Sequence, residues 1–179
     1  MKHIFLFVLL IAAAALPARA DLMEVVASPN PVAVGSTFTV VVRVLDLQSG
    51  DELVAFGMNP FISDPSKAMF LDATVDSAFE DDSGFFGGNP AIAGSALPFI
   101  DSAPVTLATL SFRALAIGPV NIGVQSDLSD PNQGLLLLSG VEDLTASTAV
   151  NVATPEPGSL VLLSSIVALA ALGVQRRRR

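Results

Sequence analysis

Side chains that carry oxygen gather at two places in the sequence, and clustered oxygens are what a Ca²⁺ ion takes from a protein. One place is the run 80–82, which reads Glu-Asp-Asp, and the other holds Asp127, Asp130 and Asn132. A solvated acidic loop and an ordinary turn are the competing interpretations, because Asp and Asn are frequent in both. We keep Asp127, Asp130 and Asn132 as Ca²⁺ candidates and expect no other metal or cofactor.

Three short motifs begin like known functional loops, and each lacks an essential part. From Asp130 the spacing matches the start of an EF-hand loop, but position twelve is Val141 instead of Glu. Residues 82–84 read Asp-Ser-Gly, as in aspartic proteases, but acids precede them and the chain has no second copy. Residues 66–67 read Ser-Lys, yet a catalytic lysine needs burial and this one falls in a predicted turn. We therefore expect no catalytic residues and no enzyme activity.

The composition excludes whole classes of chemistry. The chain has no cysteine, tryptophan or tyrosine, and its single histidine is His3. Zinc, copper and haem sites of the usual kinds need Cys or His, as do Ser-His-Asp and Cys-His catalysis. A glycosidase that uses two carboxylates remains open, but nothing singles out a pair. Flat sugar-binding faces usually use Trp or Tyr, so a glycan-binding module is the less favoured alternative.

The first twenty residues have the pattern of a secretory signal peptide. A basic start precedes an apolar core over 4–16, and Ala18 and Ala20 form the small-residue pattern that signal peptidase cleaves. We expect cleavage after Ala20, which leaves Asp21 as the first mature residue.

The last twenty-five residues have three parts in fixed order. The tripeptide Pro155-Glu156-Pro157 comes first, then an apolar run over 160–174, then four arginines, Arg176, Arg177, Arg178 and Arg179. As a helix, seventeen residues from Gly158 onward span about 25 Å, near the lower limit for crossing a bilayer. Arginines beside such a run stay cytoplasmic, which predicts that the preceding domain lies outside the cytoplasm.

Residues 154–179 resemble the PEP-CTERM sorting signal of bacteria that produce exopolysaccharide. The resemblance implies recognition by an exosortase, a membrane-embedded cysteine transpeptidase or protease, which removes the apolar segment near Pro155–Pro157. Two prolines hold this segment extended and remove two backbone donors, so a protease can bind it. The implied route runs from the inner membrane to the cell surface or the extracellular matrix.

Almost every acidic residue belongs to the exported part. All 17 Asp and Glu residues lie between Asp21 and Glu156, where the basic residues are Arg43, Lys67 and Arg113. A domain this acidic does not neutralise phosphates, so we expect no nucleic-acid partner.

The pattern between the two targeting segments predicts β structure. Residues 36–45 alternate, with Phe38, Val40, Val42 and Val44 on one face. Strand 52–61 is expected to place Val54, Phe56 and Met58 on one face, and residues 76–96 read as a long loop. The other predicted strands cover 22–27, 68–75, 98–101, 105–115, 120–125, 134–138 and 144–152. Eight or nine short strands and no amphipathic helix predict an antiparallel β-sandwich.

Two blocks are similar to cohesin-like domains. The first comprises 25–29 and 34–40, and the second covers 107–114, with Gly118 beyond it. The resemblance implies a jelly-roll sandwich over 21–152, between a signal peptide over 1–20 and a sorting signal over 153–179. Cohesins of cellulosomes bind dockerins through one sheet face, but no motif here fixes the residues of such a face.

Together these features predict a non-enzymatic surface or matrix protein. Its sandwich is expected to act as an adhesion or protein-interaction module, with exosortase, signal peptidase and the membrane as partners during export. Another surface protein or an exopolysaccharide is the expected final partner, and a glycan-binding or glycan-processing protein of the exopolysaccharide matrix is the alternative.

Overall fold

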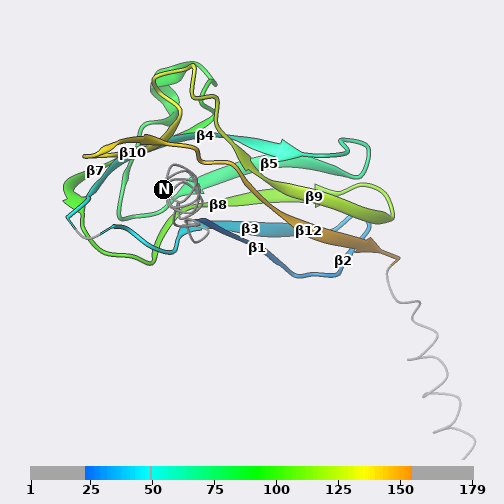
Figure 1. Cartoon of the computed structure of the whole chain (residues 1–179). Helices are drawn as coiled ribbons and strands as arrows, with labels where there is room; N and C mark the ends of the chain where they lie inside the picture. Colours follow the sequence, from blue (N-terminus) through cyan, green and yellow to red (C-terminus); the bar gives the residue numbers. More distant parts are fainter. Residues whose placement is uncertain (1–22, 49, 155–179) are drawn as a thin grey trace, which may run out of the picture.

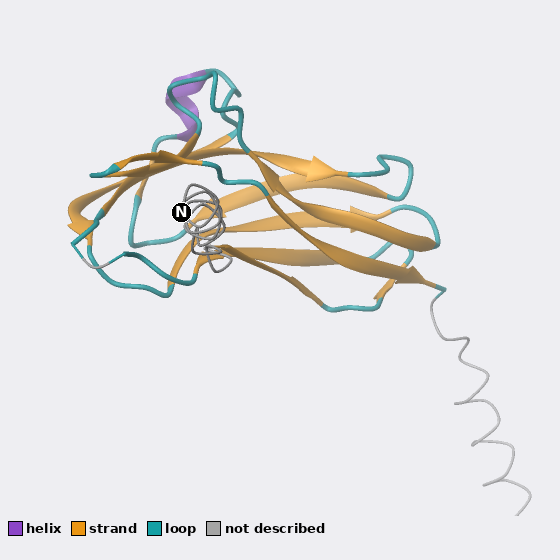
Figure 2. Cartoon of the chain, in the orientation of Figure 1, coloured by secondary structure: helices purple, strands orange, loops and turns teal. Residues whose placement is uncertain are grey.

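The computed structural model describes residues 23–48 and 50–154, which fold into a β-sandwich of two layers (Figures 1 and 2). Residues 1–22, 49 and 155–179, which include both predicted targeting segments, lie outside the described part. The all-β prediction is confirmed for the region between those segments.

The smaller sheet has four antiparallel strands in the order β1-β3-β8-β5. These are β1 (Met23–Ser28), β3 (Thr37–Val44), β8 (Val105–Ala114) and β5 (Ala68–Val75). Each agrees with a strand predicted from the sequence to within one or two residues. The predicted alternation of β3 is also confirmed, because Phe38, Val40, Val42 and Val44 are all buried.

The larger sheet is built around one long strand, β4 (Leu53–Ile62). The second half of β4 pairs with β9 (Gly118–Gln125), and its first half pairs with β10 (Gly134–Leu137) and with β7 (Ile92–Ile100). The sheet is completed by β11 (Gly140–Glu142) beside β10, β12 (Ala146–Ala153) beside β9, β6 (Glu80–Asp81) beside β7, and β2 (Val32–Ala33) beside β12.

The core lies between the sheets and is rich in phenylalanine. Phe112 of β8 is fully buried, with its ring centroid 5.7 Å from Phe38 and 5.6 Å from Phe70. Phe56 of β4 meets Phe79 edge-on at 5.0 Å. Ring pairs in these geometries add to the free energy gained by burying apolar area. This core packs the two sheets against each other.

Several details differ from the sequence prediction. Residues 76–96 contain β6, the 3₁₀ turn η1 (Ser83–Phe86) and the start of β7, so they are not one long loop. Leu53 is fully buried and Val54 only partly, because the register shifts between Leu53 and Ala55 and turns the strand. β2 lies in the connection from β1 to β3, which crosses to the edge of the other sheet. There β2 pairs with β12 in parallel, which departs from the predicted antiparallel arrangement.

Two excursions from the larger sheet form one projection above it (the top of Figures 1 and 2, with η1 in purple in Figure 2). One excursion covers 82–91, and the other covers 126–133 and joins β9 to β10. The second lies directly on β4, because a Cβ atom on Gly57 would be 1.9 Å from the carbonyl oxygen of Asn132. Only glycine leaves room for this backbone, so Gly57 fixes where the projection sits.

We predict that Phe112→Ala destabilises the domain by about 3–5 kcal/mol, since it removes a buried ring and leaves a cavity. Phe85→Ala is the matched control, because Phe85 is 82% exposed and should change stability by less than about 0.5 kcal/mol. Denaturant unfolding of residues 21–154, followed by circular dichroism, measures both. Equal effects would contradict the assigned core.

We predict that Gly57→Ala destabilises the domain by about 1–3 kcal/mol, because the added methyl collides with backbone that has no flexible end to move. Amide hydrogen exchange should rise over residues 126–133 and stay unchanged in the smaller sheet. Gly84→Ala is the control, since a Cβ there meets open space. Unchanged exchange over 126–133 in Gly57→Ala would show that the excursion does not rest on β4.

Candidate functional site

The outer face of the larger sheet carries a row of small and apolar side chains that we call the β4 row. Ala55 of β4 pairs with Leu136 of β10 on one side and with Ser95 of β7 on the other. Leu136 in turn pairs with Val141 of β11. Directly paired residues share a face, and this face is the outer one because the neighbouring pair Phe56–Leu135 is buried in the core. Four strands therefore contribute one residue each to the β4 row.

Leu128 extends the β4 row from the projection above it. A Cβ atom on Gly134 would lie 2.7 Å from Val141 Cγ1 and 3.1 Å from Leu128 Cδ2, so the two side chains converge over this glycine. Leu128 is 54% exposed and Val141 is 53% exposed. Gly134 has a φ of 110°, a conformation that L side chains rarely adopt. The result is a small apolar surface beside a rigid projection.

A network of amide side chains holds the projection together. Gln133 is buried and accepts hydrogen bonds from Asn59 Nδ2 at 3.1 Å and from the Asp127 amide at 3.0 Å. Its own Nε2 donates to Asn89 Oδ1 at 2.9 Å and to Asp130 Oδ2 at 3.3 Å. Asn59 lies on β4 and the other members lie in the two excursions. The network thus ties both excursions to the sheet and to each other.

The Ca²⁺ candidates Asp127, Asp130 and Asn132 lie in this projection, and their oxygens serve turns. Asp127 Oδ1 accepts from the Ser129 amide and hydroxyl at 2.9 and 2.7 Å. Asp130 Oδ1 accepts from the Asn132 amide at 2.9 Å. These donors lower the pKa of both carboxyls, chiefly the Ser129 hydroxyl for Asp127 and the Asn132 amide for Asp130. The arrangement is that of Asx turns.

The acidic run 80–82 is divided between a strand and a turn. Glu80 and Asp81 form β6, while the Asp82 amide donates to the carbonyl of Ala93 at 3.0 Å. Ser83 completes this connection, because its hydroxyl accepts from the Ala93 amide at 3.0 Å. Among the described residues, no group of three or more Asp, Glu, His or Cys side chains is arranged to hold a metal ion.

Asp51 lies in a shallow hollow of about 330 Å³ before the start of β4, at the opposite end of the larger sheet from the end of β12. Its carboxylate accepts from the Ser139 hydroxyl, from the Ser139 amide at 3.1 Å and from the Glu52 amide at 3.0 Å. The Ser139 hydroxyl is the main cause that lowers the pKa of Asp51, and burial opposes it. A low pKa with internal donors suits a clamp between two loops better than a general base.

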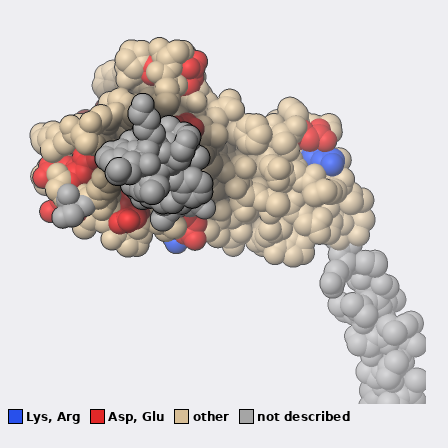
Figure 3. Space-filling model, in the orientation of Figure 1, with Lys and Arg blue, Asp and Glu red and all other residues tan. Residues whose placement is uncertain are grey.

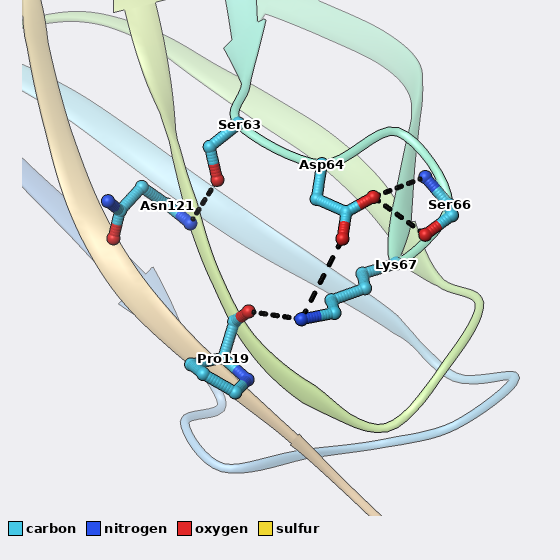
Figure 4. A network of polar contacts seen from close by, with 6 residues as sticks. All are labelled: Ser63, Asp64, Ser66, Lys67, Pro119 and Asn121. Carbon is cyan, nitrogen blue, oxygen red and sulfur yellow. Dashed lines mark hydrogen bonds and ion pairs between the residues drawn. The ribbon is translucent and has the colours of Figure 1, made fainter.

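Ser66 and Lys67 do not form a dyad, as Figure 4 shows. The Ser66 hydroxyl donates to Asp64 Oδ1 at 2.6 Å, and this bond is the first cause of the lowered pKa of Asp64. Lys67 Nζ lies 3.7 Å from Asp64 Oδ2 and donates to the carbonyl of Pro119 at 3.1 Å. The lysine therefore fastens the β4–β5 turn to β9.

The sorting residues fall outside the described part of the chain. This applies to Ala18 and Ala20, to Pro155, Glu156 and Pro157, and to the four terminal arginines. In residues 23–48 and 50–154, no helix has the length and hydrophobicity to cross a membrane.

Sequence reasoning missed the β4 row because its members come from four separate strands. Periodicity places Ala55 and Leu136 on strands, but only the register shows that they share a face, and Val141 falls between two predicted strands. One local signal was available at Leu128, an apolar residue between the turn formers Asp127 and Ser129. A large apolar side chain at a turn is unusual enough to mark a surface for inspection.

No family model and no curated protein sequence matches the chain. Among solved structures, it is similar to the cohesin module of a family 33 glycoside hydrolase from Clostridium perfringens, with a TM-score of 0.56 and 12% identity over 74% of this chain and 96% of that one. The sixth cohesin of scaffoldin B from Acetivibrio cellulolyticus, solved with a dockerin, gives a TM-score of 0.46 and 14% identity over 73% and 99%. At such identities the first likeness shows the fold alone, and that fold is a cohesin-like β-sandwich.

Proposed function

We propose that the protein is an exported, non-enzymatic surface or matrix protein whose sandwich acts as an adhesion or protein-interaction module. The observation that carries this proposal is the β4 row with Leu128, an apolar surface on an otherwise acidic domain. Contiguous exposed apolar side chains mark interaction sites more often than chance exposure does. The cohesin-like fold supports a binding role by analogy, because cohesin modules are binding domains.

The proposal is also supported by the hydrogen bonds and ion pair of the titratable side chains described above. Asp51, Asp127 and Asp130 all accept hydrogen bonds from neighbouring turns, which holds them ionised and occupied. Lys67 is paired with Asp64 and fastens a turn. Carboxylates that are occupied by internal donors are poorly placed to act as a general acid, base or nucleophile.

Export and processing complete the proposal. Signal peptidase removes residues 1–20, and an exosortase then acts at Pro155–Pro157 while residues 160–174 cross the inner membrane. The partner of the processed domain is another surface protein, with exopolysaccharide as the alternative. A glycan partner would use hydroxyl and carboxylate groups, because the chain has no Trp or Tyr to stack on a sugar ring.

We predict that residues 21–154, fluorescently labelled, bind saturably to the surface of the producing cells. Val141→Glu should weaken this binding at least about tenfold, since a charge placed within an apolar contact costs more than about 1.4 kcal/mol. Ile117→Glu is the matched control, because Ile117 is 59% exposed but lies in the β8–β9 connection at the other end of the sandwich. The interaction face is misplaced if the two variants bind alike.

A glycan array and a panel of glycoside hydrolase substrates separate the alternative functions on the same protein sample. Binding to a glycan that survives Val141→Glu would favour the glycan-binding alternative. Clear turnover of any substrate would refute the non-enzymatic proposal.

We predict that the mature protein, isolated from cell-surface and medium fractions, begins at Asp21 and lacks Arg176–Arg179. Intact-mass spectrometry measures both ends at once. Deleting the exosortase gene should leave the C-terminal arginines in place and hold the protein in the membrane fraction. Mature protein that retains Arg179 in the wild-type strain would exclude processing.

A further inference from the structure

One end of the sandwich differs from the rest of the surface in charge. This end consists of the connections 29–36, 63–67 and 115–117 together with Thr154, and we call it the exit end. Its charged residues are Asp64 and Lys67, which pair with each other at 3.7 Å. The described residues as a whole contain fifteen acidic and three basic side chains. The exit end is therefore nearly neutral on a strongly acidic domain.

The acidic residues gather away from the exit end. The connections 45–52 and 101–104 lie at the opposite end, because Val44 pairs with Val105 and Leu53 pairs with Ile100 there. They carry Asp46, Asp51, Glu52 and Asp101. Figure 3 shows the same division, with acidic residues spread over one end of the molecule and a single red and blue pair near the other.

The exit end also presents an apolar hairpin tip. Leu115, Ala116 and Ile117 join β8 to β9, and Leu115 and Ile117 are 42% and 59% exposed. The tip is held rigidly, because the Leu115 amide donates to the carbonyl of Lys67 at 2.7 Å and the Lys67 side chain lies across Gly118. The tip is therefore a turn with three consecutive exposed apolar residues, and the Lys67 side chain lies beside it.

The chain leaves the sandwich beside this tip. Val152 of β12 pairs with Gly118 of β9, so Ala153 and Thr154 follow next to Ile117. Five residues, 155–159, separate Thr154 from the apolar run that begins at Leu160. Fully extended, they reach about 17 Å. A segment that crosses the membrane from Leu160 would therefore hold the exit end close to the bilayer surface.

We propose that the exit end seats on the bilayer surface, with Leu115 and Ile117 in the interface and Lys67 near the headgroups. Apolar side chains gain free energy there, and the Asp64–Lys67 pair brings no net charge that anionic lipids would repel. The acidic end then points away from the membrane, where repulsion from anionic lipids is smallest. The seat rests on the proposed membrane-crossing tail, and while that tail is attached it holds Pro155–Pro157 at the membrane face for processing.

The chain offers a direct test because it contains no tryptophan. Ile117→Trp and Leu138→Trp each introduce a single fluorophore, at exposed positions of 59% and 58% on opposite ends of the sandwich. The chain from Asp21 with its tail intact is reconstituted into phosphatidylethanolamine–phosphatidylglycerol vesicles, with or without brominated acyl chains. We expect a blue-shifted emission and several-fold stronger quenching by bromolipid at position 117 than at position 138.

Other outcomes would contradict the proposed contact between the exit end and the bilayer, and each points to a different cause. Protein that floats with vesicles while both positions stay unquenched would refute the seat and leave the membrane-crossing tail intact. Equal quenching at both positions would show that no particular end faces the bilayer. A blue shift at 117 without quenching would assign the tip to a second copy of the chain. Protein that does not float with vesicles would refute the tail itself, and the seat with it.

Discussion

Burial of alternate side chains between two sheets is the interaction on which the rest of this structure depends. Residues 21–154 have no cysteine for a disulfide and no histidine for a metal site, so the core must supply the stability. Phe38, Phe70 and Phe112 lie together in this core. Because these rings belong to three neighbouring strands of one sheet, they fix the order of strands as well as the spacing between the layers.

A second constraint decides where the chain can leave the sandwich pattern. Gly57 and Gly123 lie where a Cβ atom would meet a backbone oxygen at 1.9 and 2.0 Å. At Gly57 the backbone that approaches is the excursion 126–133, and at Gly123 it is the paired strand β12. Without a side chain at Gly57, the excursion can lie directly on the sheet. Without a side chain at Gly123, β12 can approach its neighbour β9 closely. Glycine within a strand here marks a close approach of backbone, which is one of its established positional meanings.

The sequence predicts the strands well where one face is buried. It predicts them poorly where a short strand forms only by pairing with a segment far away in the chain. The alternation in residues 36–45 predicts β3 and its inward face, because a buried face imposes a period of two. The two-residue strands β2 and β6 escape prediction, since nothing in Val32–Ala33 or Glu80–Asp81 indicates pairing with a distant segment. The sequence predicts Val54 on the inner face of β4, but Leu53 is the buried residue. The cause is again tertiary, because the register between β4 and β7 shifts at this point. The same limit applies to the candidate site. The β4 row could not be predicted from the sequence, because its residues come together only through the register of four strands.

The same geometry separates the two surfaces for which we propose roles. The β4 row lies in the half of the larger sheet formed by β7, β10 and β11, whereas the chain leaves the domain at the far end of β12. Eight extended residues of β12 span about 26 Å, so a partner on the β4 row would not compete with the bilayer for space. An antiparallel sandwich produces this separation without a linker, since its strands carry the chain from one end to the other. In our proposal the apolar tip at 115–117 belongs to the membrane side and the row to the outer side, which is why Ile117→Glu serves as the control for Val141→Glu.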